Sequence, residues 1–415
     1  MKALKNIFLK VICCFLSLSI TIILCNKTYA NTKYVWSTNV STVPTTTSEE
    51  TPISTVQNTL NLQSGSAILI DQDSGQILYE HNMHEKLRPA SVTKIMSILL
   101  VMEALDSGQI KLTDKVPCSE NASSMGGSQI WLTTTETLTV DEMLKCMCVV
   151  SANDCTVAMA EFLCGSTDAF VEKMNKRAKE LGMNDTCFKN CHGIDEDGHV
   201  SSSYDIALMS RELLSKHPSI KNYTTIWMDS IRDGKSQLVN TNKLVRNYEG
   251  CTGLKTGSTS LALYNLSASA TRDNLNLIAV IMQAPTTALR FSEAKQLLDY
   301  GFNNYTSYQL STENEIVKNI SISQGVEKNI NGVYSSTNNI MLQKGSESKI
   351  TQEINIPDKL TAPVSQGEKI GEINYCLDGN IISTVDVVSD KSIKKIGFVN
   401  MSTYLIKQWF TLLRA

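Results

Sequence analysis

The sequence predicts an α+β domain, followed by a small all-β domain and a C-terminal amphipathic helix. Strand patterns lie at both ends of the first domain with amphipathic helices between them, so its sheet must be assembled from distant parts of the chain. Beyond Tyr305 the pattern changes to short alternating segments separated by Asn-Gly and Asp-Gly turns, which is typical of a β module. From Phe398 to Leu413 apolar side chains recur at helical spacing.

The length and charge of the chain limit its function class. A chain of 415 residues is long enough for roughly two or three domains with at least one sizeable core. It carries 38 basic and 41 acidic residues, for a net charge of −3. This balance gives no broad positive surface, so we do not expect a nucleic-acid partner.

The first thirty residues are typical of an export signal. Lys2, Lys5 and Lys10 precede an apolar run from Val11 to Cys25, and Ala30 offers a small residue at the cleavage edge. A retained single-span anchor is the alternative, although the run is short for a membrane span. Lipidation of Cys25 is rejected because Leu24 occupies the preceding position. We therefore predict an exported, extracytoplasmic protein.

The predicted boundaries follow from shifts in composition. Residues 31–63 are rich in Thr, Ser and Asn and predict a flexible linker. Residues 64–304 form the first domain, residues 305–390 the β-rich domain, and residues 391–415 the terminal helix with its basic flank.

The elements of the first domain follow from hydrophobic periodicity and turn residues. A hairpin opens it, with a turn at Asp73-Ser74-Gly75. The predicted strands are Ser66–Asp71, Gln76–Tyr79, Leu261–Ala270 and Leu275–Met282. The predicted helices are Ser91–Leu105, Val140–Val150, Asp154–Leu163, Asp168–Leu181, Ser203–Leu214 and Thr287–Tyr300.

Nine cysteines remain after the predicted cleavage, an odd number that cannot all pair within one chain. They lack the regular spacing of a disulfide framework, and several lie on apolar helical faces, which favours mostly free thiols. They are residues 118, 146, 148, 155, 164, 187, 191, 251 and 376. The chain has no CxxC or HExxH pattern, so the sequence predicts no metal site.

Ser91 and Lys94 stand three residues apart at the start of a predicted helix, which places them about one turn apart on one face. A buried Lys can act as the base for a Ser nucleophile because desolvation lowers its pKa. The spacing alone is weak evidence, since Ser346 to Lys349 and Ser392 to Lys395 repeat it in the β-rich domain.

Ser151 and Asn153 lie on the turn between two predicted helices. The Ser can relay protons, and the Asn amide can hold a peptide carbonyl and the Lys. Helix capping is the alternative, and the same triplet arises at Ser119-Glu120-Asn121.

Lys255-Thr256-Gly257-Ser258 stands immediately before the predicted strand that begins at Leu261. The Lys and a hydroxyl can bind an anionic substrate end, and Gly allows close approach of the backbone to a ligand. A solvated loop Lys followed by an ordinary turn is the alternative.

The three motifs occur in the order typical of penicillin-binding proteins and class A β-lactamases. The sequence around these motifs closely resembles that of the low-molecular-mass D-alanyl-D-alanine carboxypeptidases of peptidoglycan metabolism. The segments that carry the resemblance are Arg88–Met96, Ser151–Cys155, His192–Asp195, Gly253–Gly257 and Leu297–Phe302. The resemblance implies a penicillin-binding/β-lactamase-like transpeptidase domain and extends over the β-rich domain and the terminal helix.

The resemblance implies a role for each motif residue. Ser91 matches the acylated nucleophile, Lys94 its general base, and Ser151 with Asn153 the second catalytic element. His192 and Asp195 match a family signature, and we expect them to be structural.

The remaining roles are also implied by the resemblance. Lys255, Thr256 and Gly257 match the motif whose strand lines the substrate cleft, and the backbone N–H groups of Ser91 and Ser258 would form the oxyanion hole. Arg290 matches an Arg that helps to hold the terminal carboxylate of the substrate, which suits its planar fork. A helix-surface Arg is the alternative.

The predicted activity is therefore that of a serine carboxypeptidase that removes the terminal D-Ala from peptidoglycan stem pentapeptides through an acyl-enzyme, with no metal or cofactor. β-Lactam antibiotics are the expected inhibitors. A β-lactamase is the first alternative, but its Glu-x-x-Leu-Asn element is absent: Glu212-Leu213-Leu214 is the nearest fragment. A strict transpeptidase and a non-catalytic penicillin-binding sensor also remain open.

The terminal helix predicts peripheral attachment to the outer face of the membrane. Phe398, Met401, Leu405 and Trp409 share its apolar face. The basic residues that would favour anionic lipid are Lys391, Lys394, Lys395, Lys407 and Arg414. The alternative is a helix that packs on the β-rich domain.

Overall fold

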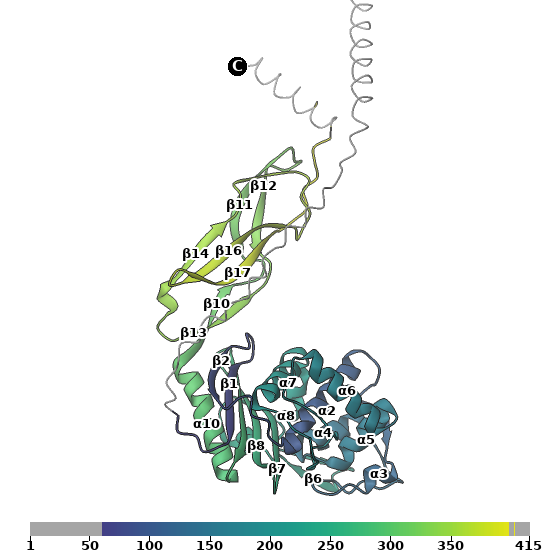
Figure 1. The fold of residues 1–415 in the computed structure, drawn as a ribbon. Helices are drawn as coiled ribbons and strands as arrows, with labels where there is room; N and C mark the ends of the chain where they lie inside the picture. The colour runs from purple at the N-terminus through teal and green to yellow at the C-terminus, as the bar shows by residue number, and fades with distance from the viewer. Residues whose placement is uncertain (1–59, 398–401, 403–415) are drawn as a thin grey trace, which may run out of the picture. The chain divides into compact units, whose positions relative to one another are not determined.

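The computed structural model describes residues 60–397 and residue 402 (Figure 1). The expected signal peptide, most of the expected linker, and the apolar face of the expected terminal helix lie outside these residues. Across the described part of the chain, no helix combines the length and apolar character needed to cross a membrane.

The first domain is built on a five-stranded antiparallel sheet, in which strands from the two ends of the domain are neighbours. This arrangement confirms the predicted α+β class. The strand order is β2-β1-β9-β8-β7, so β7 forms an edge. The strands are β1 (Ser66–Asp71), β2 (Ile77–His81), β7 (Cys251–Thr259), β8 (Leu263–Arg272) and β9 (Leu275–Ala284).

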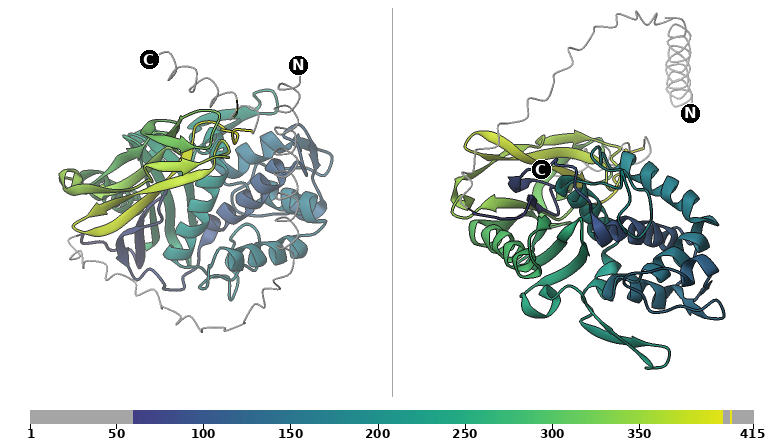
Figure 2. Two further views of the ribbon diagram at one scale, coloured as in Figure 1. Left: turned by 90° about the horizontal axis from the view of Figure 1, so that it is seen from above. Right: turned by 60° about the horizontal axis from the view of Figure 1, so that its bottom comes forward.

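Both faces of the sheet are covered, as the side chains of β1 demonstrate. Because strand side chains alternate between faces, Ile68 and Ile70 join the core beneath the main group of helices, whereas Ala67 and Leu69 join a second core against α10 (Thr287–Asn304). Figures 1 and 2 show α10 on the opposite side of the sheet from α2 and α7.

Five of the six predicted helices occur away from α10, with ends shifted by a few residues, and the sixth, Thr287–Tyr300, is α10 itself. The structure adds three four-residue helices that the sequence did not predict. Side-chain caps fix several helix starts: the Thr139 hydroxyl and the Glu142 carboxylate form a capping box on α4. The helices are α2 (Lys94–Asp106), α3 (Glu120–Ser123), α4 (Val140–Val149), α5 (Asn153–Cys164), α6 (Thr167–Glu180), α7 (Ser203–Lys216), α8 (Lys221–Thr224) and α9 (Leu244–Asn247). Short additional elements are η1 (Ala90–Thr93), η2 (Pro218–Ile220), β3 (Lys115–Pro117), β4 (Thr137–Thr139), β5 (Met228–Ile231) and β6 (Ser236–Val239).

The second domain is all-β, as predicted. A two-stranded sheet pairs β10 with β13, and a six-stranded sheet has the order β14-β16-β17-β12-β11-β15. Its strands are β10 (Tyr305–Ser311), β11 (Ile316–Ser323), β12 (Asn329–Tyr334), β13 (Asn338–Gln343), β14 (Ile350–Asn355), β15 (Lys359–Thr361), β16 (Lys369–Leu377) and β17 (Asn380–Ser389), with a 3-10 turn, η3 (Glu347–Lys349).

Two predicted boundaries need correction. Leu60 and Leu62, assigned to the linker, pack against the α10 core, and the Gln63 amide donates to Glu293 at 2.7 Å. Residues 391–396, assigned to the terminal helix, belong to the β-rich domain: Ile393 is buried in its core and pairs with Val364. Local composition could not predict either boundary correctly, because the contacts that order these residues come from distant segments of the chain.

Two expectations at the motifs were also wrong. The Lys255 motif lies inside β7 rather than before a strand. The sequence did not predict β7 because the Gly, Thr and Ser of this edge strand give no alternating apolar pattern. The predicted helix from Ser91 begins as η1, and regular α-helix starts only at Lys94.

Leu99 tests the core under the sheet. It is fully buried in α2, so Leu99→Ala should lower the free energy of unfolding by about 2–5 kcal/mol through lost burial and a residual cavity. Urea unfolding followed by circular dichroism measures this loss. Ile316→Ala, at an exposed position in β11, is the control and should change stability by no more than about 0.5 kcal/mol; equal effects would contradict the assignment of the core.

Candidate active site

Ser91 and Lys94 meet at the junction of η1 and α2. Lys94 Nζ lies 3.0 Å from Ser91 Oγ, 2.6 Å from Asn153 Oδ1 and 2.7 Å from the His192 carbonyl oxygen. A neutral amine has two N–H donors and one lone pair. When the donors are directed at Asn153 and His192, the lone pair is left to accept the proton of the Ser91 hydroxyl.

The environment of Lys94 favours this neutral form. Burial, followed by repulsion from the Lys255 cation, holds the pKa of Lys94 well below its ordinary value. None of its three close contacts is a carboxylate, and the more distant Asp154 opposes the lowering only in part. The lowered pKa favours the neutral amine that a general base requires.

The Ser151–Asn153 turn connects α4 to α5 and faces Lys94. Ser151 adopts φ 63°, a left-handed conformation unusual for Ser, and its buried Oγ has no hydrogen-bond partner among residues 60–397. Asn153 is fixed by two further bonds, from its Nδ2 to the Gly126 carbonyl and from its amide N to the Ser128 carbonyl, both at 2.7 Å. The turn thus holds one amide rigidly and leaves one hydroxyl available.

Lys255 and Thr256 lie in the interior of β7. Lys255 is buried, and its Nζ donates to the Thr256 carbonyl at 2.9 Å. Burial lowers the pKa of Lys255 to about 7, and the nearby Arg290 cation contributes to this shift. The Thr256 hydroxyl donates to Thr241 Oγ1 at 2.7 Å. An anionic ligand would restore the charged state of Lys255, because an opposite charge raises the pKa of an amine.

Gly257 allows β7 to approach Ser91. A Cβ at Gly257 would come within 2.8 Å of Val92 N and 2.9 Å of both Ser91 N and Pro89 O. The sequence suggested close approach to a ligand, whereas the structure shows close approach to η1. Ser258, the next residue, is exposed. The close approach of Gly257 to Ser91 N brings β7 to the segment in which the oxyanion hole is predicted.

Arg290 is buried, so the helix-surface alternative is wrong. Its Nη1 donates to the carbonyl oxygens of Gly257 and Asn265 at 3.2 and 3.3 Å. Burial lowers the pKa of Arg290 to about 10, and its Nε is buried without a partner within the described chain. Arg290 therefore joins β7 to β8 directly behind the Lys255 motif.

The His192–Gly193 loop is a part of the site that the sequence treated as structural. The His192 side chain is structural, since its Nδ1 accepts from the Ile194 amide at 3.2 Å, but its carbonyl holds Lys94. Gly193 has φ 90°, and a Cβ there would lie 1.9 Å from the Ala90 carbonyl oxygen. A backbone acceptor supplied from about a hundred residues away has no signature in the sequence.

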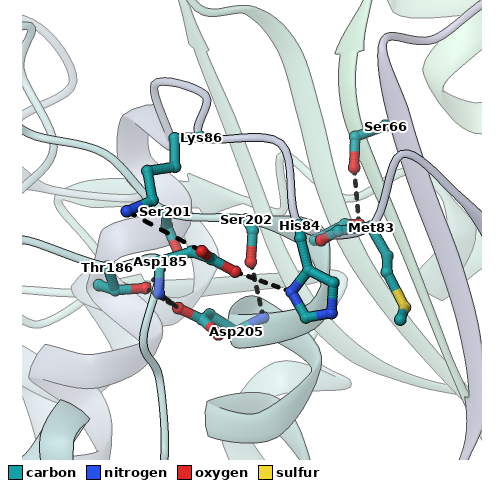
Figure 3. A network of polar contacts seen from close by, with 10 residues as sticks. Ser66, Met83, His84, Lys86, Asp185, Thr186, Ser201, Ser202 and Asp205 are labelled. Carbon is teal, nitrogen blue, oxygen red and sulfur yellow. Dashed lines mark hydrogen bonds and ion pairs between the residues drawn. The ribbon is translucent and has the colours of Figure 1, made fainter.

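A polar network supports the segment that carries this loop (Figure 3). Asp205 of α7 accepts from the Asp185 amide and the Thr186 hydroxyl at 2.8 and 2.7 Å, and Asp185 in turn contacts His84 at 2.8 Å. Ser202 caps α7 by accepting from the Asp205 amide. These bonds fix the two ends of the segment from Asp185 to Ser202, which contains His192 and its carbonyl.

The nine cysteines of the described residues are free, in agreement with the prediction of mostly free thiols. Burial raises the pKa of Cys148 and of Cys191 to about 12, so both remain neutral thiols although they lie near Lys255 and Lys94. Over the described residues, no group of His, Cys and carboxylate side chains is arranged to hold a metal ion.

Comparisons with known proteins agree with this geometry. Residues 51–286 match a family described as D-alanyl-D-alanine carboxypeptidase, and residues 305–395 match the C-terminal domain of penicillin-binding protein 5. D-alanyl-D-alanine carboxypeptidase DacF of Bacillus subtilis is 43% identical over 351 residues, which cover 84% of this chain and 90% of the relative. DacC of Escherichia coli is 31% identical, over 80% and 84% of the two chains.

Solved structures are similar as well. Penicillin binding protein 5 from Haemophilus influenzae matches with a TM-score of 0.68 and 30% identity, over 81% of this chain and 99% of that one. Penicillin-binding protein D2 from Listeria monocytogenes, in its ampicillin-bound form, matches with a TM-score of 0.54 and 31% identity, over 59% and 99% of the two chains.

Gly257→Ala tests the approach of β7 to η1. The added Cβ meets backbone atoms, which cannot rotate away, so β7 must shift from the Ser91 amide. We expect acylation by a fluorescent penicillin to slow by at least about tenfold, because misplacing a reacting group by 1 Å can cost more than this. Gly397→Ala, where an added Cβ meets no atom within 4 Å and the backbone is unstrained, is the control; an unchanged rate in Gly257→Ala would show that the contact is unimportant.

Lys255 also predicts a pH dependence of stability. Its folded pKa of about 7 lies below the ordinary value of about 10.4, so the unfolded chain binds more protons between these values and stability rises with pH. The raised pKa values of the buried thiols reverse the trend above about pH 8.5. Between pH 7 and 8.5, Lys255→Met should reduce the slope of unfolding free energy by up to about 1.4 kcal/mol per pH unit. Urea unfolding at several pH values measures this, and identical slopes would refute it.

Proposed function

This chain belongs to the D-alanyl-D-alanine carboxypeptidase family, and we propose that Ser91 is its nucleophile and Lys94 its general base. The observation that carries the proposal is the position of Lys94 Nζ, 3.0 Å from Ser91 Oγ and hydrogen-bonded to two fixed acceptors. The substrate class follows from the family: peptides that end in D-Ala-D-Ala.

The reaction proceeds through an acyl-enzyme. Ser91 Oγ attacks the carbonyl carbon of the terminal peptide bond while its proton passes to Lys94. The N–H groups of Ser91 and Ser258 stabilise the charge on the tetrahedral oxygen. The C–N bond then breaks, and the unpartnered Ser151 hydroxyl relays a proton from Lys94 to the departing amine of D-Ala. Water attacks the ester with the same base and releases the shortened peptide.

The substrate lies along β7 in this proposal. As an edge strand, β7 can pair with one more extended chain. Lys255 and Arg290 supply the positive charge that receives the terminal carboxylate, and the Asn153 amide contacts the peptide. A carboxylate bound there would return Lys255 to its charged state.

A carboxypeptidase is favoured over the alternatives. The relatives are named carboxypeptidases, and the chain lacks the Glu-x-x-Leu-Asn element expected of a class A β-lactamase. A penicillin-binding sensor would be acylated without releasing D-Ala. β-Lactams would acylate Ser91, in line with the ampicillin-bound form of the Listeria protein.

The enzyme acts outside the cytoplasm in this proposal, exported by residues 1–30 and tethered by residues 31–59. Attachment to the outer membrane face by an amphipathic helix after Gly397 would hold it near newly made peptidoglycan. The β-rich domain carries no catalytic motif and would serve as a spacer.

Ser91→Ala tests the nucleophile. The variant should lose both fluorescent-penicillin labelling and D-Ala release, because Ser91 Oγ is the hydroxyl that is hydrogen-bonded to Lys94 Nζ. Ser346→Ala and Ser392→Ala, in the repeated spacings of the β-rich domain, should retain both. Labelling that survives Ser91→Ala would refute the assignment, and penicillin hydrolysis faster than D-Ala release in the wild type would favour the β-lactamase.

Truncation tests the membrane anchor. A chain ending at Gly397 keeps Ile393 in its core and should fold, release D-Ala from soluble peptide at the wild-type rate, and no longer sediment with anionic vesicles. A chain ending at Asp390 loses Ile393 and should be less stable. Undiminished vesicle binding by the chain ending at Gly397 would exclude the anchor.

A further inference from the structure

Trp131 is the most exposed large apolar side chain of the described residues, at 74% relative exposure. Its backbone has φ 56°, a left-handed conformation that is a genuine outlier for a bulky side chain. An aromatic ring held in solvent by a strained backbone gains nothing from burial, so the surrounding structure must impose its position.

The backbone on both sides of Trp131 is fixed by buried or paired charges. One carboxylate oxygen of Asp154, which is fully buried, accepts from the amides of Ile130 and Leu132, each at 3.0 Å. Arg232 Nη1 donates to the Ile130 carbonyl at 3.0 Å. Trp131 is thus held by three bonds to its two neighbours.

Arg232 is itself fixed. Its guanidinium forms a bidentate pair with Glu136, at 2.5 and 2.7 Å, and this pairing lowers the pKa of the Glu136 carboxyl. The pair stiffens the tip of the β5–β6 hairpin, where Arg232 lies directly after β5. Exposed loops are normally mobile, so this degree of restraint indicates that the ring position matters.

Asp154, Arg232 and Glu136 together form what we call the Trp131 clamp. This clamp is joined to the active site at two points. Asp154 directly follows Asn153, and the Ser128 carbonyl that receives the Asn153 amide is three residues from Trp131. The second connection runs through the β5–β6 hairpin. At its tip, Arg232 donates to the Ile130 carbonyl, and shortly after β6, Thr241 accepts a hydrogen bond from the Thr256 hydroxyl of β7.

We propose that Trp131 is a specificity-determining residue that packs its indole ring against a sugar ring of glycan-linked substrate. The inference rests on the proposed function. Four residues of a stem pentapeptide precede the scissile bond, and an extended tetrapeptide spans about 13 Å; in this proposal the sugar end of the substrate therefore lies well beyond the Lys255 motif, beside the Trp131 ring. A pyranose presents an apolar C–H face with hydroxyls at its rim, which complements the flat apolar face and N–H edge of Trp. The small methyl side chains of the terminal alanines would not use such a surface.

The experiment compares two substrates that share the same peptide: an N-acetylated pentapeptide and a disaccharide-pentapeptide. Trp131→Ala should raise KM about five- to tenfold on the disaccharide-pentapeptide, within the range of a single aromatic contact, with kcat unchanged because the contact is equal in ground and transition states. On the acetylated peptide KM should change less than about twofold. Trp131→Phe should restore most of the affinity.

Two controls keep the test decisive. Trp131→Asn removes the ring but suits the left-handed backbone, so it should reproduce Trp131→Ala if the ring rather than local folding matters. Ile316→Ala removes another strongly exposed apolar side chain, at 62%, and should leave both KM values unchanged. Equal losses on the two substrates, or no loss on either, would overturn the proposal. A wild-type enzyme that released D-Ala from neither substrate would instead refute the proposed function.

Discussion

The chemistry depends on one buried amine that has no anionic partner. Lys94 contacts a hydroxyl, an amide oxygen and a backbone carbonyl, and burial with the nearby Lys255 lowers its pKa. A carboxylate in any of these positions would stabilise the ammonium form and remove the base. The fold therefore has to bring three neutral polar groups from three chain segments to the same nitrogen.

This requirement explains the close packing and backbone strain around the nucleophile. Gly193 lies against the Ala90 carbonyl and Gly257 against the Ser91 amide, at distances that admit no Cβ. Ala90 and Ser151 both have positive φ, at 49° and 63°. Such conformations persist only where the surroundings over-determine them, and here the sheet, the α4–α5 turn and the His192 loop do so together.

The same arrangement opposes stability. Lys94, Lys255 and Arg290 are buried without a carboxylate among their hydrogen-bond partners, and burying uncompensated charge is unfavourable. Lowered pKa values relieve part of this penalty for the two lysines by letting them become neutral. A bound carboxylate would relieve more, so substrate binding and stability should be coupled at this site.

The sequence by itself determined the fold class, the six longer helices, four of the five strands of the main sheet and the three motifs, because periodicity, caps and turn residues act over a few neighbouring residues. It could not reveal the β7 edge strand, whose Gly, Thr and Ser pattern is set by contact with η1 rather than by alternation. Nor could it identify the His192 carbonyl as the third contact of Lys94, since every residue carries a carbonyl. The burial of Ile393 and the clamp on Trp131 were decided in the same way. Each depends on groups far apart in the chain, and only the packed tertiary structure determines which of them meet.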